Sequence, residues 1–348
     1  MNYLKLIRYK NLIFIIVLMI LMKYAVINPL LSIYGMESPV PVWIFWLLTA
    51  GVVLISAGGY VINDYFDTKI DALNRPDRII VGNSISRERA NLLFQILTGA
   101  GIACGLAVAL AAWSFTVGLI FIFVPGLLWF YSASYKRQFL IGNIIVAFCA
   151  ALVPLVVVLT ENAFLLRTYS SELIKQTPII QTLYLWICGF SFFAFFTTFI
   201  REIIKDMEDE YGDRETECRT MPVVWGFTKS KIVVSIITIF TMAALTVVSY
   251  IVLKSIHFAE GAGFVRYIVM GVLIPFICLL YLIFTAKRSA DYRQAATFTK
   301  YLMFFGIVFG VVLLMLLLMI NYDFSIFGLR LMPVGTEVPE GIEDVIRF

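Results

Sequence analysis

The stretch that decides the fold is WIFWLLTAGVVLISAGGYVI at residues 43–62, which is followed without a break by NDYFDTKID at residues 63–71. The first part carries no charge and is long enough to cross a bilayer as a helix. If the helix continues at about 100° per residue, one amide and three carboxylates fall within an arc of about 100°. These four residues are Asn63, Asp64, Asp67 and Asp71. Carboxylates this close repel one another, so the pattern predicts a cation among them.

A second acidic segment, KDMEDEYGD at residues 205–213, repeats the order of the first. Its three aspartates stand at the positions of Asp64, Asp67 and Asp71, and they are Asp206, Asp209 and Asp213. Oxygen ligands without His or Cys nearby favour Mg²⁺, which is usually held by one or two carboxylates together with substrate phosphates. The sequence therefore predicts that the two segments face each other and hold a magnesium diphosphate.

The composition indicates a multi-pass membrane protein, because 61% of the 348 residues are hydrophobic and only 14% are charged. The net charge of +4 is spread over the connections, without the dense basic patch of a nucleic-acid-binding protein. The five cysteines are too far apart to form a metal knuckle or a redox pair. Four of them lie in apolar segments, and we interpret these four as small buried apolar residues.

Nine apolar segments are long enough to span a membrane, which predicts an all-α bundle of nine transmembrane helices. The first is a retained helix and not a signal peptide, because its apolar run continues to about Leu31 without a cleavage site. The other eight lie at about 43–62, 90–112, 115–134, 139–160, 180–200, 230–253, 265–285 and 301–320. Residues 1–321 are predicted to form one transmembrane domain with Asp-rich loops, and residues 322–348 an exposed extension.

The distribution of Lys and Arg predicts the orientation of the chain in the cell membrane. Basic residues concentrate in the amino terminus and in four connections, at 63–89, 135–138, 201–231 and 286–300. The positive-inside rule makes these segments cytoplasmic, and both acidic segments belong to them. Nine crossings then place the carboxyl terminus outside.

Several cations are expected on the same side of the membrane as the acidic segments, where they could neutralise a diphosphate. Arg75 and Arg78 follow the first segment, whereas Lys136 and Arg137 lie in the loop between the fourth and fifth helices. Lys23 is different, because it lies deep inside an apolar span. An intramembrane charge usually faces the bundle interior, so Lys23 has either a structural or snorkelling role or a place in the lining of a substrate cavity.

These features resemble the UbiA-type intramembrane prenyltransferases. The resemblance lies in Asn-Asp-x-x-Asp-x-x-x-Asp at 63–71, the second acidic motif, the Tyr131 to Arg137 loop and the nine helices. It implies that the metal and diphosphate ligands are Asn63, Asp67, Asp71, Asp209 and Asp213, and that the diphosphate-binding cations are Arg75, Arg78, Lys136, Arg137 and Lys205. The common Arg-Pro-x-Asn of the family reads Arg8-Tyr9-Lys10-Asn11 here, and Asn11 is still expected to face the site.

Within the family, the stretch from Arg201 to Pro222 is most similar to digeranylgeranylglyceryl phosphate synthases. The resemblance implies that a prenyl group passes from a prenyl diphosphate, geranylgeranyl diphosphate by preference, to a geranylgeranylglyceryl phosphate acceptor in the membrane. Asp64 and Asp206 are candidate bases for the acceptor hydroxyl, and the leaving diphosphate is an equal alternative. Tyr131 is a candidate for the cavity wall, where aromatic faces stabilise an allylic cation.

Other functions fit the sequence less well. An aromatic acceptor, of the hydroxybenzoate or dihydroxynaphthoate type, is the main alternative, because those enzymes have a similar first motif. An ion-coupled transporter would place its acids near the middle of broken helices, and here they cluster at helix ends. Phosphatidyl-alcohol transferases carry an Asp-Gly-x-x-Ala-Arg element that this sequence lacks. A structural scaffold with solvated acidic loops would not explain the matched spacing.

Overall fold

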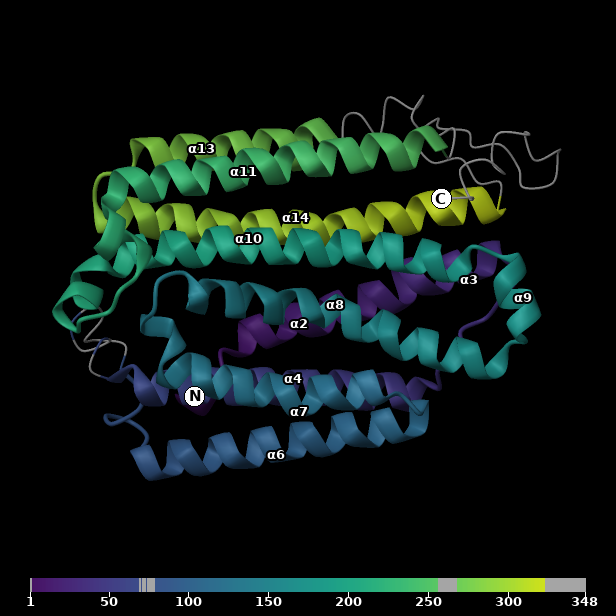
Figure 1. The fold of residues 1–348 in the computed structure, drawn as a ribbon, viewed down its shortest axis with the longest axis horizontal. Coiled ribbons are helices and arrows are strands. Elements are labelled where there is room, and N and C mark those ends of the chain that lie inside the picture. Colours follow the sequence, from purple (N-terminus) through teal and green to yellow (C-terminus); the bar gives the residue numbers. More distant parts are fainter. Residues whose placement is uncertain (1, 69, 71–72, 74–78, 256–267, 323–348) are drawn as a thin grey trace.

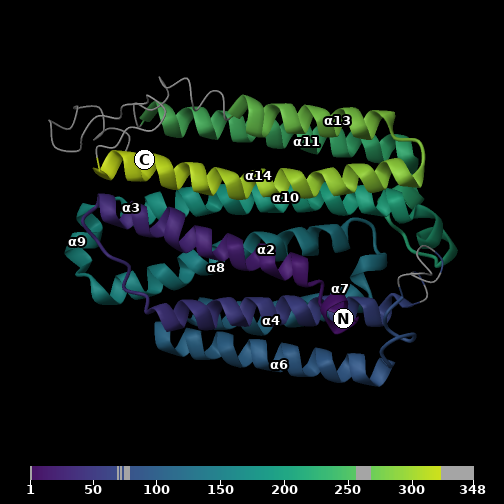
Figure 2. The same cartoon turned by 180° about the vertical axis from the view of Figure 1, so that it is seen from behind.

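The chain folds as a bundle of helices in the computed structural model, which describes residues 2–68, 70, 73, 79–255 and 268–322. Eight helices in that part of the chain are long and apolar enough to cross a membrane, and a shorter apolar helix covers Val269–Thr285. Together they match the nine predicted segments, so the predicted all-α transmembrane class is confirmed. The helices run along the long axis of the molecule in both views (Figures 1 and 2).

The elements follow one another with short connections. Their bounds are α1 Asn2–Leu6, α2 Tyr9–Ile20, η1 Leu21–Ile27, α3 Asn28–Ile33, α4 Val42–Phe66, α6 Arg87–Ala112, α7 Phe115–Ala133, η3 Tyr135–Arg137, α8 Ile141–Thr168, α9 Ser171–Gln176, α10 Ile179–Glu215, α11 Met221–Ser255, η5 Ile268–Leu273, α13 Ile274–Thr285 and α14 Ser289–Tyr322.

Prolines explain where two of the spanning helices widen into π-helix. The first span runs from Tyr9 to Ile33 as α2, η1 and α3, and η1 ends just before the Asn28-Pro29 start of α3. The π-helix η5 likewise ends before Pro275. Proline has no N–H for the bond to residue i−4 and its ring crowds that carbonyl, so the preceding turn opens.

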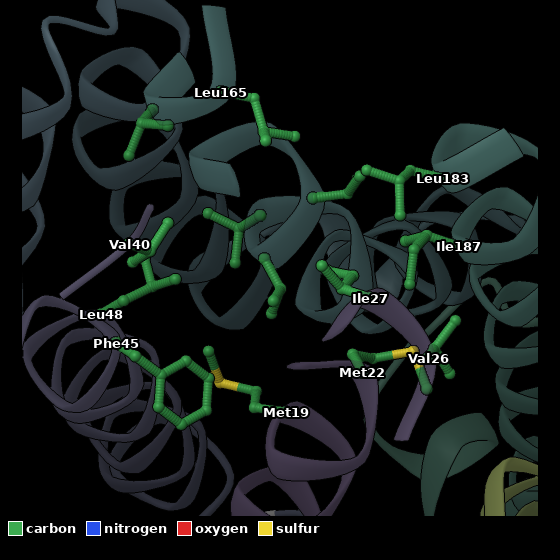
Figure 3. Close-up of a cluster of buried hydrophobic side chains, with 14 of the residues drawn as sticks. Met19, Met22, Val26, Ile27, Val40, Phe45, Leu48, Leu165, Leu183 and Ile187 are labelled. Atoms are coloured by element: carbon green, nitrogen blue, oxygen red, sulfur yellow. The ribbon is translucent and has the colours of Figure 1, made fainter. Parts of the chain in front are cut away.

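The main apolar core fills the half of the bundle that lies away from the acidic segments. It joins side chains of the first span, the start of α4, the end of α8 and the start of α10 (Figure 3). Met19, Met22 and Ile27 are fully buried there, packed with residues such as Leu48 and Ile187. A second core joins α10, α11, α13 and α14. Neither of these two cores reaches the last turns of α4. A smaller apolar cluster around Leu6 and Val61 packs there, beside the polar side chains.

Segments that are far apart in the sequence meet at one end of the bundle, on the left in Figure 1. The amino terminus, the end of α4, the turn η3, the end of α10 and the start of α14 all lie there. Hydrogen bonds link them, for example from the Ser289 hydroxyl of α14 to the Glu208 carbonyl oxygen of α10 at 2.9 Å. The charge pattern predicts this grouping, since these are the segments rich in Lys and Arg.

Close packing of α4, α6 and α7 depends on glycine. The Phe121 ring of α7 is 2% exposed and lies against Gly105 of α6, where an added Cβ would be 1.9 Å from the ring. A Cβ on Gly51 of α4 would also approach this ring, at 2.8 Å. Real Cβ contacts are never this short, so a larger residue at Gly105 must displace Phe121.

We expect Gly105→Ala to destabilise the bundle by about 1–3 kcal/mol, because the extra methyl group overpacks the α6 and α7 contact. The measurement is the melting temperature of the purified protein in detergent. Gly99→Ala is the matched control, since a Cβ at Gly99 meets no atom within 4 Å. An unchanged melting temperature in Gly105→Ala would contradict the packing described here.

Candidate active site

The two acidic segments are held by helices in different ways. Asn63 and Asp64 are in the last turn of α4, and Asp67 caps that helix. The sequence predicts a loop for the second segment, but the structure corrects this, because α10 continues as one helix to Glu215. Its 37 residues span about 55 Å, well beyond the apolar thickness of a bilayer. The second set of carboxylates is therefore carried by one continuous helix.

Lys136 connects the two acidic segments. Its ammonium group on η3 forms an ion pair with the Asp67 carboxylate, which is 7% exposed. The charges of Lys136 and Asp67 both act on the Asp213 carboxyl group of α10, and so does Asp209. The Thr220 hydroxyl donates a hydrogen bond to Asp213 Oδ2 at 3.1 Å. Carboxylates from α4 and α10 thus share one electrostatic site, as the sequence predicts.

Two further contacts hold the first segment. The Asn63 side-chain amide donates to Asp67 Oδ2 at 2.8 Å, which leaves Asn63 Oδ1 buried without a hydrogen-bond partner. Arg8 Nη2 lies 2.9 Å from Asp64 Oδ1. Asn11, predicted to face the site, donates from its side-chain amide to the Tyr60 hydroxyl at 3.3 Å, one turn of α4 before Asp64.

Asp206 connects the second segment to α8. Its Oδ2 accepts a hydrogen bond of 2.8 Å from the side-chain amide of Asn143, near the start of α8. The Tyr131 hydroxyl lies within electrostatic reach of Asp206, Asp67 and Arg8. Tyr131 is thereby placed among the predicted site residues.

The loop that carries Lys136 is fixed by its backbone. The Arg137 carbonyl oxygen accepts a hydrogen bond of 2.8 Å from the Arg219 backbone N–H, in the segment after α10. This bond ties the η3 turn to the helix that carries the second set of aspartates. The neighbouring Cys218 is buried, and burial raises the pKa of its thiol, so it stays protonated and unreactive.

The donor set at this site fits Mg²⁺. It consists of hard oxygen atoms, and the buried, unpartnered Asn63 Oδ1 is an oxygen with capacity for a further ligand. Within the described ranges, no three His, Cys, Asp or Glu side chains lie close enough to hold a metal by themselves. A magnesium site that shares substrate phosphate oxygens needs only one or two carboxylates. The predicted ligand Asp71 and the predicted cations Arg75 and Arg78 lie outside the described residues.

Sequence reasoning missed Glu202, which is 7% exposed and lies one helical turn before Asp206. Its two carboxylate oxygens contact different cations: Oε1 pairs with Arg201, and Oε2 accepts from Lys205 Nζ at 2.9 Å. Lys205, predicted to bind the diphosphate, is therefore held beside Glu202. The signal was present in the spacing, because residues 202, 206, 209 and 213 follow the helical period and share one face of α10.

Lys23 lies apart from the acidic segments, in the half of the bundle that holds the main apolar core. Its ammonium group is 2.5 Å from Glu161 Oε2 of α8 and also contacts the Ser38 hydroxyl. Lys23 is 4% exposed and Glu161 is 1% exposed. Sequence analysis ends the fifth span at residue 160, whereas α8 continues to Thr168, so Glu161 is an internal residue of the helix. Lys23 therefore has the intramembrane partner that its position requires.

The fold and the site define a multi-pass helical membrane protein with two carboxylate groups gathered at one end around a lysine. The sequence matches the model of the UbiA prenyltransferase family over residues 12–307. The chain therefore belongs to the UbiA prenyltransferase family.

Individual relatives agree with this family. A protein named digeranylgeranylglyceryl phosphate synthase from Saccharolobus solfataricus is 32% identical over 266 residues, which cover 75% of this chain and 82% of that protein. A protein of the same name from Sulfurisphaera tokodaii is 33% identical over 197 residues, which cover 54% of this chain and 62% of that protein. The chain thus spans somewhat less than two thirds of the second relative.

Solved structures share the fold. A UbiA homologue from Aeropyrum pernix K1 aligns with a TM-score of 0.59 at 15% identity, over 86% of this chain and 98% of the other. A UbiA homologue from Archaeoglobus fulgidus bound to GPP and Mg²⁺ aligns with a TM-score of 0.51 at 16% identity, over 90% of this chain and 100% of the other. At these identities the likeness concerns the arrangement of helices.

The buried ion pair of Lys23 and Glu161 predicts that a single substitution lowers stability more than a double substitution does. We expect Lys23→Met to destabilise the protein by about 3–5 kcal/mol, because Glu161 then keeps a buried charge without a partner. The double variant with Glu161→Met should recover most of the loss, since two apolar side chains of similar size replace the pair. Melting temperatures in detergent measure both effects. A double variant no more stable than Lys23→Met alone would contradict this account.

Proposed function

We propose that this prenyltransferase moves a prenyl group from a prenyl diphosphate to an acceptor lipid in the membrane, with Mg²⁺ at the acidic site. The observation that carries the proposal is the position of Lys136, which pairs with Asp67 while its charge also acts on Asp213. A single ligand of the size of a diphosphate, placed at Lys136, would lie against both acidic segments.

Asn63, Asp67, Asp209 and Asp213 are the described residues that would hold the metal, with two Mg²⁺ ions as the expected number. The A. fulgidus homologue bound to GPP and Mg²⁺ supports the choice of ligand and metal. When bound, Mg²⁺ stabilises the negative charge that develops on the leaving diphosphate. Lys136 adds a positive charge at the same place, and its neighbour Arg137 is positioned by the backbone bond to Arg219.

Asp206 is the better placed of the two candidate bases for the acceptor hydroxyl. Asp64 is bound to Arg8, whereas Asp206 is oriented by a neutral partner, the Asn143 amide. Its second oxygen, Oδ1, makes no hydrogen bond within the described part of the chain, and it would accept the hydroxyl proton as the new C–O bond forms. Tyr131 lies beside Asp206 and gives the site an aromatic face toward the allylic group. The surrounding apolar helices keep water away from that reactive carbon.

The acceptor we favour is geranylgeranylglyceryl phosphate, with geranylgeranyl diphosphate as donor. Support comes from the relatives, several of which are named digeranylgeranylglyceryl phosphate synthase. The excess of Lys and Arg at the active end supports a place for this end on the cytoplasmic side of the cell membrane.

A screen with one donor and three acceptors tests the substrate. Purified protein is given geranylgeranyl diphosphate, Mg²⁺ and either geranylgeranylglyceryl phosphate, 4-hydroxybenzoate or dihydroxynaphthoate. We expect prenylation of the glyceryl phosphate and loss of all transfer when EDTA removes the metal. Prenylation of an aromatic acceptor alone would replace the proposed acceptor, and full activity in EDTA would refute the role of Mg²⁺.

The metal ligands are tested by single substitutions. Asp67→Ala and Asp209→Ala should each lower the rate of transfer by more than about 100-fold at saturating Mg²⁺, because each removes a charged oxygen ligand at the diphosphate. Expression should stay normal. Glu210→Gln is the control on the same helix, since in the described part of the chain Glu210 forms its ion pair with the exposed Arg214, one turn further along α10. Normal turnover in either aspartate variant would reject the assignment.

A further inference from the structure

A second group of charges lies deeper in the bundle than the aspartates, around Glu202. Arg201 and Lys205 each occupy one oxygen of the Glu202 carboxylate. With both oxygens taken by cations, Glu202 is not available as a metal ligand. It holds two cations in place one turn of α10 below Asp206.

Two more cations from other helices join this group. Lys300 of α14 lies within electrostatic reach of Arg201, Lys205 and Glu202. Arg8, just before α2, acts on both Glu202 and Lys300. Four cations from three segments of the chain therefore gather here, although they are far apart in the sequence.

The group carries more positive than negative charge. Two carboxylates pair directly with its four cations, Glu202 with Arg201 and Lys205, and Asp64 with Arg8. The remaining neighbour, Asp206, is hydrogen-bonded to Asn143 instead. When Asp206 is counted, four cations face three carboxylates among the described residues, which leaves a surplus of one positive charge. Uncompensated charge is costly where apolar helices surround it.

One donor in the group also lacks a partner. The Nε atom of Arg201 is buried and makes no hydrogen bond to any residue that the structure describes, although the Nη1 atom of the same guanidinium group contacts Glu202. A buried donor without an acceptor is unfavourable, so its presence indicates an acceptor that binds from outside the chain. An oxyanion would satisfy both the free donor and the surplus charge.

We infer that Arg201, Lys205 and Lys300, with Arg8 beside them, form a subsite for the phosphate monoester of the acceptor lipid. The inference rests on the proposed function and deepens it by naming how the acceptor is recognised. A phosphate monoester carries a charge of about −1.5 to −2 near neutral pH, so it supplies the negative charge that the group lacks.

The geometry suits a glycerol that carries a phosphate next to the reacting hydroxyl. Lys205 and Asp209 are one turn apart on α10, or about 6 Å along the helix axis. The acceptor phosphate and the donor diphosphate would thus occupy neighbouring levels of one helix, with Asp206 between them. Lys300 is exposed on α14, so the phosphate of a lipid can reach it from the bilayer.

Binding without metal tests the subsite separately from catalysis. The full-length protein in detergent and EDTA is titrated with geranylgeranylglyceryl phosphate, or with neutral geranylgeranylglycerol, and the shift in melting temperature gives each affinity. We expect the phosphate lipid to bind more tightly than the neutral lipid. Arg201→Gln and Lys300→Gln should each weaken binding of the phosphate lipid about tenfold and leave the neutral lipid unchanged.

Two controls keep the result interpretable. Lys300→Arg should retain tight binding because it keeps the charge, which separates loss of charge from loss of fold. Lys229→Gln removes an exposed cation on α11, outside the group, and should bind as the unmodified protein does.

The subsite is refuted if the unmodified protein does not distinguish the phosphate lipid from the neutral one, or if both Gln variants bind it normally. Tight, charge-dependent binding without any prenyl transfer in Mg²⁺ would leave the subsite standing and refute the proposed function. If both Gln variants transfer the prenyl group at a normal rate and with a normal KM for the acceptor, the subsite is refuted and the proposed function stands.

Discussion

Repulsion between carboxylates from α4 and α10 is the constraint on which the active end of this molecule depends. Asp67 and Asp213 come from segments about 140 residues apart, and they are held together because Lys136 supplies a positive charge between them. Neutral donors complete the arrangement: the Asn63 amide, the Asn143 amide and the Thr220 hydroxyl each contact one carboxylate. These groups come from α4, η3, α8, α10 and the segment after α10, so the site exists only when the bundle is closed.

The helix bundle can pack closely and still hold a charged site, because its main apolar core lies elsewhere. The main core lies away from the acidic segments, and glycines such as Gly105 bring α6 and α7 into close contact around Phe121 (Figure 3 shows the core). The charged end is then free to use its interior for hydrogen bonds and ion pairs. The donor that we propose, a prenyl diphosphate, has the same division into a charged head and an apolar chain.

Elsewhere in the bundle, charged side chains are also found beside partners of opposite charge. Lys23 and Glu161 join the first span to α8, and Glu202 joins the cations of α10 to those near α2 and α14. Each is an ion pair inside an apolar surrounding, where a lone charge would be costly. The first pair is balanced, whereas the group around Glu202 is not. That difference separates a structural contact from a place where a ligand is expected.

The sequence determined the class of fold. Apolar runs of spanning length and clusters of basic residues are local features, and they determine which segments cross a bilayer and in which orientation. The sequence also determined the two acidic motifs, because their spacing follows the helical period. Tertiary structure decided the rest. Contacts between helices depend on distances that the spacing within one helix does not encode. Such contacts are the pairing of Asp67 with Lys136, the pairing of Glu161 with Lys23, and the gathering of cations from three segments around Glu202. Even α10 shows this limit, because its polar last turns look like a loop until packing against α14 keeps them helical.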